Sequence, residues 1–452
     1  MVVAGFREQI AWLEEKGELV RVPGEVDPRY QLAAIAKKMQ SGPALYFEKV
    51  KGYDIPVVVG TDNSRARIAG ALGTDNEGLL RHYISAIESP VEPRQVNTGP
   101  VKEVVRTSGF DLGRDLPVPT HYERDGGPYI TTGLLVAELP EKGIRNVSMH
   151  RLQVVGPDEM GILMLPRHLK AMFSEREEAG RPLQIAVVIG TDIACRLASV
   201  TWGSKIPLGM DEFAIAGALR GRPVELVRCE TVDVRVPADA EMVIEGEILP
   251  GVRRPEGPMA EFTGNYGEVW ENPVIKVKAI THRKNPIYQD LLTFTPEHHL
   301  LLGLPYEPVV YALVKARMPN LKSVCVTPAG CGKFHVVISI KKTHQGDGKD
   351  TIIAGLYSIW DIKLVTVVDD DVDPFDPADV EWAVSTRFQA DRDLVVIPGA
   401  KGNELDPSLP EPGITAKMGI DATKPLTNSR RFERIGIPGF EDVNLEDFIK
   451  LK

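Results

Sequence analysis

The sequence lacks the features that mark several large classes of protein. Its four cysteines form no Cys-x-x-Cys pair, which argues against a disulfide framework or a thiolate-rich metal site. No stretch approaches the roughly 18 consecutive apolar residues of a membrane span, and the N-terminus has no signal-peptide pattern. With 53 basic against 63 acidic side chains and no long basic run, the chain also lacks the charge clusters that bind nucleic acid. We therefore predict a cytoplasmic protein with neither a membrane span nor a nucleic-acid partner.

Well-known catalytic and nucleotide-binding motifs are missing as well. The chain contains no GxxxxGK[ST] loop, and no GxGxxG follows a strand-like segment, so the usual backbone cradles for ATP and dinucleotides are not expected. It contains no GxSxG elbow and no HExxH helix either.

Composition and length indicate a globular chain with more than one domain. Its 43% hydrophobic and 26% charged residues are ordinary values, which exclude wholesale disorder. At roughly 150 residues per domain, 452 residues predict two or three domains.

The patterning of apolar residues changes twice along the chain. Helix-like and strand-like segments alternate up to about residue 110, starting with a helix from Phe6. Short β-rich runs follow, interrupted by predicted helices at 166–174 and 211–219, which favours a barrel or sandwich. From about Glu297 the alternation returns, with one helix predicted up to Lys315 and another at about Pro377–Arg387. The run Leu364–Val368 predicts a buried strand of a parallel sheet. The predicted domains are 1–112, 113–297 and 298–452.

Two segments near the C-terminus allow more than one interpretation. Asp369–Asp371 follow a predicted strand and form either a metal site or, as is commoner, a solvated turn. The final run FEDVNLEDFIKLK is amphipathic and has little core of its own, so we expect it to pack on another subunit.

A first polar cluster lies in the run Asn146-Val-Ser148-Met-His150-Arg151. Polar side chains in a β-prone run indicate either a polar edge strand, the commoner case, or a strand that faces a ligand. Regular alternation puts Asn146 and Arg151 on opposite faces, because their separation is odd. A shared site therefore requires a bulge or a strand end between them.

A second cluster is the loop Glu256-Gly-Pro-Met-Ala-Glu261-Phe-Thr-Gly264. Its proline and glycines predict an irregular loop in which two carboxylates can converge. Acids in a loop are usually surface groups, but a cation such as Arg151 between them indicates paired carboxylates for proton transfer.

A third cluster combines His168 and Glu212, each early in a predicted helix. Such residues are usually capping or surface groups. Together with Asn146 they offer mixed oxygen and nitrogen ligands, which suit Mn²⁺ or Mg²⁺ better than zinc.

In this order, the clusters resemble those of the UbiD family of decarboxylases, which depend on prenylated FMN. The resemblance spans most of the chain and includes ELVRVPGEVDP, LPVPTHYERDGGPYIT, NVSMHR, PRH, DEFAIAGALRG, VPADAEMVIEG, EGPMAEFTGNYG, SIKK and VVDDDVDP. It implies a fold of α/β and β parts: an N-terminal α/β domain, a central split β-barrel that binds prenylated FMN, and a C-terminal α/β oligomerisation domain with a terminal helix. It also implies a homodimer or homohexamer.

The same resemblance implies roles for individual residues. It implies that Asn146, His168 and Glu212 bind the divalent metal, which is Mn²⁺ or Mg²⁺ with a K⁺ nearby. In the family this metal bridges the cofactor phosphate to the protein. Residues assigned to cofactor binding are Asn146, Ser148, Met149, Arg151, Arg167, His168 and Glu212. The catalytic network is Arg151, Glu256 and Glu261, with Glu261 as the proton donor. The resemblance leaves the lysine that binds the flavin phosphate open between Lys349 and Lys363. It puts the K⁺ contacts around Thr201–Ser204.

The expected substrate pocket follows from alignment to the same family. It comprises Arg167, Phe262, His298, His299, Leu302 and Tyr306. Relatives that decarboxylate furan dicarboxylates carry Arg near position 306, where this chain has Tyr306. A second carboxylate loses its bidentate partner there, unless the adjacent Arg167 replaces it. We therefore expect a monocarboxylic aromatic or heteroaromatic acid.

The function expected from the sequence is reversible, non-oxidative decarboxylation that releases CO₂, with a separate UbiX-type prenyltransferase supplying the cofactor. Two alternatives are an FMN-dependent oxidoreductase on a split barrel and a non-catalytic subunit of a larger carboxylase complex.

Overall fold

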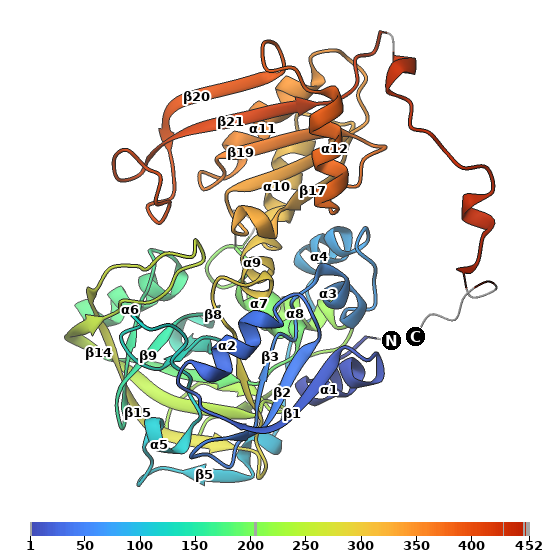
Figure 1. The fold of residues 1–452 in the computed structure, drawn as a ribbon. Coiled ribbons are helices and arrows are strands. Elements are labelled where there is room, and N and C mark those ends of the chain that lie inside the picture. Colours follow the sequence, from blue (N-terminus) through green and yellow to red (C-terminus); the bar gives the residue numbers. More distant parts are fainter. Residues whose placement is uncertain (1, 203–205, 428, 446–447, 449–452) are drawn as a thin grey trace.

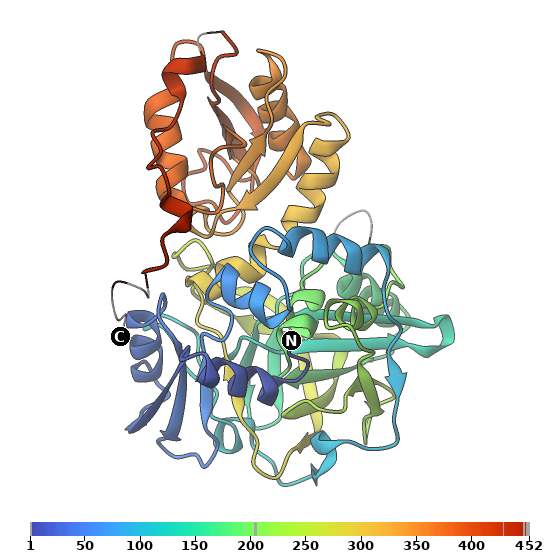
Figure 2. The same cartoon turned by 90° about the vertical axis from the view of Figure 1, so that its right-hand side faces the viewer.

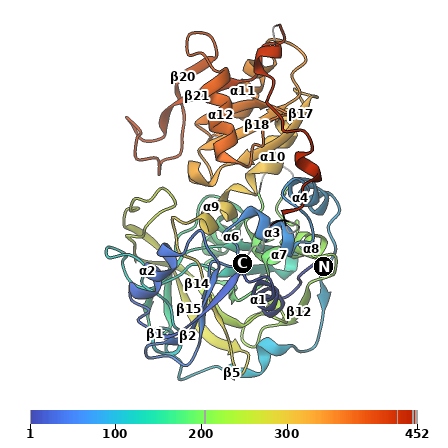
Figure 3. The same ribbon diagram turned by 45° about the vertical axis from the view of Figure 1, so that its right-hand side comes forward.

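The protein consists of two lobes joined through one short helix. The computed structural model describes residues 2–202, 206–427, 429–445 and 448. Figure 1 shows the N-terminal and central sheets packed together in the lower lobe and the C-terminal sheet in the upper lobe, and Figure 2 shows the same division at right angles. Helix α9 (Pro296–Gly303) lies between the lobes, as Figure 3 also shows.

The N-terminal part is a four-stranded sheet with order β1-β2-β3-β16. Its elements are α1 (Phe6–Glu15), β1 (Leu19–Val26), α2 (Gln31–Lys38), β2 (Ala44–Val50), β3 (Val57–Val59), α3 (Arg65–Ala71), α4 (Leu79–Glu88) and β16 (Tyr288–Asp290). The predicted first helix is confirmed: Ile10 and Leu13 are buried on its inner face, and Gly17, with φ of 69°, follows its end. Strand β16 comes from much later in the chain, so the N-terminal and central parts share a sheet.

The central part is a sheet of nine strands whose hydrogen-bonded path does not close into a barrel. Its order is β6-β9-β10-β15-β14-β11-β7-β8, with β5 paired to β15. The strands are β5 (Val104–Arg106), β6 (Tyr129–Ile130), β7 (Leu134–Leu139), β8 (Ile144–Met149), β9 (Leu152–Gly156), β10 (Glu159–Ile162), β11 (Leu183–Ile189), β14 (Met242–Glu256) and β15 (Trp270–His282). Strand β8, which carries the first polar cluster, is at one end of this path.

Three helices accompany the central sheet, two at predicted positions and one that was not predicted. They are α6 (His168–Glu178), α7 (Ile193–Ser199) and α8 (Glu212–Leu219). Both α6 and α8 contact β8, which brings the starts of two helices to the strand that carries Asn146. A short helix, α5 (Leu112–Asp115), and a small sheet of β4 (Arg94–Gln95), β12 (Glu225–Arg228) and β13 (Arg235–Pro237) complete this lobe.

The C-terminal part is a five-stranded sheet with order β17-β18-β19-β21-β20. Its elements are α10 (Tyr306–Lys315), β17 (Leu321–Val326), β18 (His335–Ile340), α11 (Asp347–Ser358), β19 (Leu364–Asp369), α12 (Pro377–Arg387), β20 (Leu394–Lys401) and β21 (Ile414–Ala422). The buried strand β19 pairs in parallel with β18 and β21, as the apolar run predicted. The single helix expected up to Lys315 is two, α9 and α10, separated at Leu304 and Pro305.

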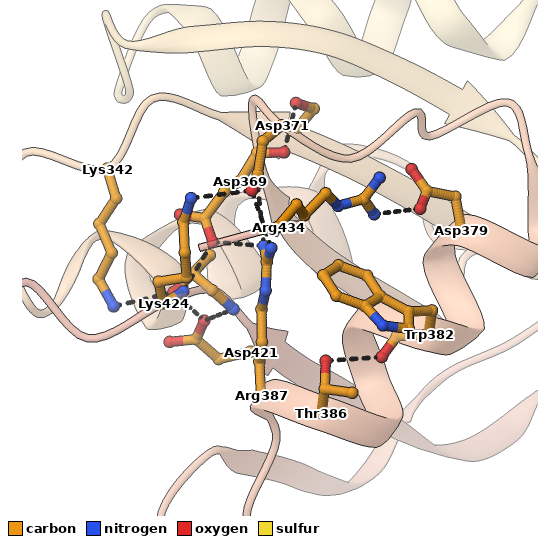
Figure 4. A network of polar contacts seen from close by, with 12 residues as sticks. Lys342, Asp369, Asp371, Asp379, Trp382, Thr386, Arg387, Asp421, Lys424 and Arg434 are labelled. Atoms are coloured by element: carbon orange, nitrogen blue, oxygen red, sulfur yellow. Dashed lines mark hydrogen bonds and ion pairs between the residues drawn. The ribbon is translucent and has the colours of Figure 1, made fainter. Parts of the chain in front are cut away.

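The acids after β19 form an ion network with basic side chains. Asp369 accepts hydrogen bonds from Arg387 Nη1 (2.9 Å) and the backbone N–H of Lys424 (2.7 Å), as Figure 4 shows. Asp371 accepts from the same guanidinium and from Lys424 Nζ at 2.9 Å. Because Arg387 and Lys424 already pair with Asp369 and Asp371, these two acids form an ion network. They form neither a metal site nor a purely solvated turn.

The segment after β21 leaves the upper lobe and runs apart from the body in Figure 1. Arg434 pairs with Asp379 and lies 4.0 Å from the centroid of the Trp382 ring, which ties the start of this segment to α12. Two 3₁₀ turns lie on either side of Arg434, at Ser429–Phe432 and Phe440–Asp442. Of the predicted terminal segment, 440–452, the first six residues contain the 3₁₀ turn at Phe440–Asp442, while 446–447 and 449–452 lie outside the described residues.

These observations confirm the predicted mixed α/β architecture. None of the helices in the described ranges is long and apolar enough to cross a membrane.

A buried pair between His121 and Asp290 predicts a pH-dependent contribution to stability. His121 Nε2 lies 2.8 Å from Asp290 Oδ2, and both side chains are buried. Burial is the largest single influence and lowers the pKa of His121, but the charge of Asp290, its hydrogen bond and the charge of Asp125 together outweigh burial and raise the pKa above 6.5. Protonated His121 therefore stabilises the fold below the unfolded pKa of about 6.5, and this contribution is lost as pH rises through the higher folded value.

We expect the free energy of unfolding of the wild type to exceed that of His121→Asn most at about pH 5.5, with the gap shrinking towards about pH 9. Urea denaturation across this range measures it. A gap that widens as pH rises would contradict the pairing.

Candidate active site

The predicted interruption between Asn146 and Arg151 is present. Strand β8 ends at Met149 and β9 begins at Leu152, which leaves His150 and Arg151 outside regular pairing. The backbone N–H of His150 instead donates to Gly133 O at 3.3 Å. The break removes the strict alternation that would keep Asn146 and Arg151 on opposite faces.

Arg151 bridges the two predicted glutamates. One terminal nitrogen, Nη1, donates to Glu261 Oε1, and the other, Nη2, donates to Glu256 Oε2 at 3.0 Å. Burial lowers the pKa of Arg151, but both carboxylates counter this and raise it overall, so the guanidinium stays charged. Its third donor nitrogen, Nε, is buried and has no hydrogen-bond partner among the described residues. The second cluster is thus a pair of carboxylates around a cation.

The two glutamates have different surroundings. Glu256 ends β14 and is fully buried, with a side-chain exposure of 0% against 16% for Glu261. Besides Arg151, Glu256 accepts hydrogen bonds from Tyr129 OH and Asn272 Nδ2, both at 3.0 Å. Burial, with the Glu256 charge, raises the pKa of Tyr129, so the phenol remains a donor. No donor other than Arg151 reaches the Glu261 carboxylate in the described part of the chain. Glu256 is therefore held by three donors, whereas Glu261 has one, and no hydrogen bond from the described residues reaches its second carboxylate oxygen.

Asn146 and Glu212 are adjacent across the contact between β8 and α8. The N–H of Val147, the residue after Asn146, donates to Glu212 Oε2 at 2.8 Å. Burial raises the pKa of Glu212 to about 8, because no cation is paired with this carboxylate strongly enough to offset desolvation. Asn146 Nδ2 donates to Ser148 Oγ at 2.9 Å, while no hydrogen bond reaches Asn146 Oδ1 from the described residues.

The structure does not join His168 directly to the other two predicted ligands. It is the first residue of α6, which contacts β8, and no hydrogen bond or ion pair within the described ranges links it to Asn146 or Glu212. Burial, followed by the charge of Arg167, lowers the pKa of His168, which keeps the imidazole neutral. No group of three or more His, Cys, Asp or Glu side chains among the described residues is arranged to hold a metal. The predicted ligand set is not a group of this kind, because one of its three members, Asn146, is an asparagine.

The structure gives little support to the lysine expected at the cofactor phosphate or to the expected K⁺ contacts. Lys363 Nζ is held by Asp406 Oδ2 at 2.5 Å and by Ser408, and Lys349 is exposed on α11. Thr201 Oγ1 donates to Leu197 O at 2.9 Å. The rest of the Thr201–Ser204 stretch includes 203–204, which lie outside the described residues.

Three of the predicted pocket residues meet where α9 approaches the loop after β14. His299 Nε2 donates to Phe262 O at 2.8 Å, and the rings of His298 and His299 stack with centroids 6.1 Å apart. Burial lowers the pKa of His298 to about 3, so its ring is neutral. Phe262 also packs edge-to-face on Phe334, at 5.5 Å between centroids.

Two more pocket residues meet around a tryptophan. The Trp202 ring packs edge-to-face on Tyr306 at 4.8 Å, and the guanidinium of Arg167 lies 4.9 Å from the Trp202 centroid. Tyr306 OH donates to Asp361 Oδ2, which is buried. Leu302 is half-buried on α9, and Met149 is half-buried against the core beneath β8.

Several residues at this site were not predicted. They are Tyr129, Asn272, Trp202, Asp361 and Lys333. Lys333 Nζ lies 4.7 Å from the Phe262 centroid and makes no hydrogen bond or ion pair with any described residue. Burial lowers its pKa, with Asp361, Arg167 and Glu261 near enough to contribute. Lys333 follows a turn that packs on α9, and no pattern in the sequence indicated that it lies at this site.

Comparison with known families matches three successive parts of this chain. The 3-octaprenyl-4-hydroxybenzoate carboxy-lyase (UbiD) N-terminal domain matches residues 10–87, its Rift-related domain 94–296 and its C-terminal domain 299–422.

Individual relatives are similar over nearly their whole length. Anhydromevalonate phosphate decarboxylase of Methanothermobacter thermautotrophicus is 39% identical, over 92% of this chain and 97% of the relative. Gallate decarboxylase of Lactiplantibacillus plantarum is 34% identical, over 91% and 92%. The UbiD-class enzyme HmfF from Pelotomaculum thermopropionicum, solved with FMN, is 48% identical with a TM-score of 0.95, over 98% and 100%. The apo 3,4-dihydroxybenzoic acid decarboxylase of Enterobacter cloacae is 34% identical with a TM-score of 0.94, over 99% of each chain.

Proposed function

The chain belongs to the UbiD family of carboxy-lyases, and on that premise we propose that it reversibly decarboxylates an aromatic or heteroaromatic acid with prenylated FMN and a divalent metal. The single observation that carries the chemistry is Arg151 held between Glu256 and Glu261. Together with the match to decarboxylases along the whole chain, it favours a carboxy-lyase over an oxidoreductase or a non-catalytic subunit.

The residues present fit the proposed cofactor. Arg151 Nε is a buried donor without a partner, which suits an acceptor atom of a flavin ring system. Asn146 Oδ1 and the buried Glu212 carboxylate are oxygen ligands of the kind that Mn²⁺ or Mg²⁺ prefers, and the neutral His168 adds a nitrogen. A metal held by these three residues would bind the cofactor phosphate in place of a glycine cradle. The structural relatives solved with FMN and with prenylated FMN support the same assignment. We place the cofactor in the central domain, 113–297, with Ser148, Met149 and Arg167 beside it.

When bound, prenylated FMN supplies the electron sink for the carbon that loses CO₂. The chain's own task is to protonate that carbon, and Glu261 is the residue with a carboxylate oxygen free to do so. Arg151 holds Glu261 in place, and Glu256, fixed by Tyr129 and Asn272, holds Arg151 in turn. Carboxylation in the reverse direction uses the same groups.

The position of Glu261 depends on the absence of a side chain at Gly267. A Cβ there would lie 2.9 Å from Glu261 Oε1, which is too close. We expect Gly267→Ala to lower kcat by up to about 100-fold by displacing the carboxylate. Its melting temperature should barely change, because the displaced atom ends a flexible side chain. The control is Gly24→Ala, where an added Cβ meets nothing within 4 Å. Wild-type kcat in Gly267→Ala would show that Glu261 need not occupy this position.

An aromatic substrate is supported by the rings that gather around α9. Phe262, His298, His299 and Phe334 pack together there, and the Trp202–Tyr306 pair lies under Arg167. Neutral imidazole and aromatic surfaces favour a flat ring over a flexible chain. Tyr306 donates to Asp361 and is not itself a cation, so a second carboxylate would have Arg167 as its only cationic partner beside Tyr306 among the described residues. These contacts support a monocarboxylic acid.

A second candidate substrate is a phosphorylated, non-aromatic unsaturated acid. The unpaired ammonium of Lys333 and the guanidinium of Arg167 favour it, since both suit a phosphate. The anhydromevalonate phosphate decarboxylases at 39% identity act on this class.

A substrate panel with protein co-expressed with a UbiX-type prenyltransferase tests the proposal. We expect CO₂ release from aryl or heteroaryl monocarboxylic acids and little from furan dicarboxylate or phosphorylated aliphatic acids. Turnover confined to the phosphorylated acids would replace the first substrate class with the second. Failure of the whole panel with fully loaded protein would reject both.

We also propose that the chain forms a homodimer or homohexamer. The segment beyond β21 exposes apolar side chains at Ile435 (101%), Ile437 (72%) and Val443 (53%), which a second copy would cover. A relative solved in an evolved dimeric form supports this.

A further inference from the structure

Four groups at the start of the site form a continuous hydrogen-bond chain that ends on a predicted metal ligand. Asn146 Nδ2 lies 2.9 Å from Ser148 Oγ, Ser148 Oγ lies 3.0 Å from His150 Nε2, and His150 Nδ1 lies 3.1 Å from the carbonyl oxygen of Leu163. No role in the reaction has been assigned to His150 so far. Asn146, Ser148 and His150 are two residues apart in turn, so alternation along β8 puts their side chains on the same face, with His150 just past the end of the strand.

The direction of every bond in this chain is fixed from its far end. A backbone carbonyl can only accept, so His150 Nδ1 must carry the hydrogen that donates to Leu163 O. A neutral ring then has a bare Nε2, which can only accept, and the Ser148 hydroxyl must donate to it. The Ser148 oxygen is left with lone pairs, which accept from the amide nitrogen of Asn146. The Asn146 carbonyl oxygen is therefore the atom left free.

His150 remains neutral over the working range of pH. Burial lowers its pKa to about 4, with the charge of Arg167 acting in the same direction. A protonated ring would donate from both nitrogens, and the Ser148 hydroxyl would then accept from His150 instead of donating to it.

We propose that His150 is a positioning residue that, through Ser148, holds the Asn146 amide with its oxygen towards the divalent metal. Without an acceptor at position 150, the Ser148 hydroxyl is free to donate to Asn146 Oδ1 instead. The amide then turns over and presents its NH₂ group, which cannot bind a cation. This inference rests on the proposed metal site of Asn146, His168 and Glu212. Groups that orient metal ligands typically change metal affinity by about 10–100-fold when removed.

Mn²⁺ binding to flavin-free protein mixed with FMN tests this without any turnover, by following free Mn²⁺ with electron paramagnetic resonance. We expect His150→Phe, which keeps the ring volume but has no acceptor, to raise the Kd for Mn²⁺ by about 10–100-fold. His150→Gln can accept from Ser148 and donate to Leu163, so it should restore most of the affinity.

The decisive control is a double-mutant cycle with Asn146→Asp. A carboxylate offers oxygen in either orientation, so His150→Phe should have no further effect on Mn²⁺ affinity in that background. A merely structural role for His150 predicts the same loss in both backgrounds, which would overturn the inference, as would wild-type affinity in His150→Phe.

His168→Ala separates this inference from the metal site on which it rests. If His168→Ala binds Mn²⁺ like the wild type, the proposed metal site is wrong. If only His168→Ala loses affinity, the metal site stands and the role of His150 falls. Should His150→Phe fail to fold, Ser148→Ala, alone and with Asn146→Asp, makes the same comparison.

Discussion

Glu261→Gln is expected to remove turnover, with kcat falling by about 10²–10⁴-fold or more, while the cofactor still binds. Glutamine keeps the size of the side chain and can still accept the hydrogen bond from Arg151, but it has no acidic proton to give. Because general acid catalysis contributes about this factor, its loss should appear in kcat and leave the KM nearly unchanged.

The measurement is steady-state CO₂ release from protein with a known flavin content. Flavin absorbance and mass confirm that the variant is loaded as fully as the wild type. Glu268→Gln is the matched control, since Glu268 is an exposed acid on the same loop and should leave kcat unchanged. Wild-type kcat in Glu261→Gln would remove Glu261 from its role as proton donor.

Arg151→Met should destabilise the flavin-free protein by roughly 3–5 kcal/mol, because it leaves the buried Glu256 carboxylate without its cation. Tyr129 and Asn272 still donate to Glu256, but neither carries charge. Turnover should also be lost, since nothing then holds Glu261. Arg151→Lys keeps a charge but not the fork that reaches both carboxylates, so we expect intermediate stability and low activity.

Urea unfolding of flavin-free protein measures this effect. Arg151→Met combined with Glu256→Gln removes the buried charge as well as its partner, and should recover much of the stability without restoring turnover. If Arg151→Met has the same free energy of unfolding as the wild type, the charge of Glu256 does not depend on Arg151.

The sequence predicted most elements whose apolar residues follow a clear period. Helix α12 was predicted with its observed bounds, because Pro377 starts it and buried side chains recur along it. Helix α7 was missed: all seven of its residues, Arg196 included, are buried, so it has no polar face to reveal a helical period. The break between α9 and α10 was missed because the apolar pattern continues through Leu304.

The residues alone left the candidate site open between surface groups and a shared site, and the resemblance to the UbiD family decided between them. Arg151, Glu256 and Glu261 come together as expected, while the metal role of Asn146, His168 and Glu212 stays a proposal. The donors that distinguish the two glutamates were not predictable, because Tyr129 is 127 positions from Glu256 and Asn272 lies on the next strand. Lys333 comes from the other lobe, and only the fold brings it to Phe262.

Native mass spectrometry of the protein co-expressed with a UbiX-type prenyltransferase, with CO₂ release measured on the same samples, tests the central claim most directly. The account predicts a chain that carries prenylated FMN and a divalent metal, with a rate proportional to the loaded fraction. CO₂ release at the same rate from protein that carries unmodified FMN, or no flavin, would contradict it.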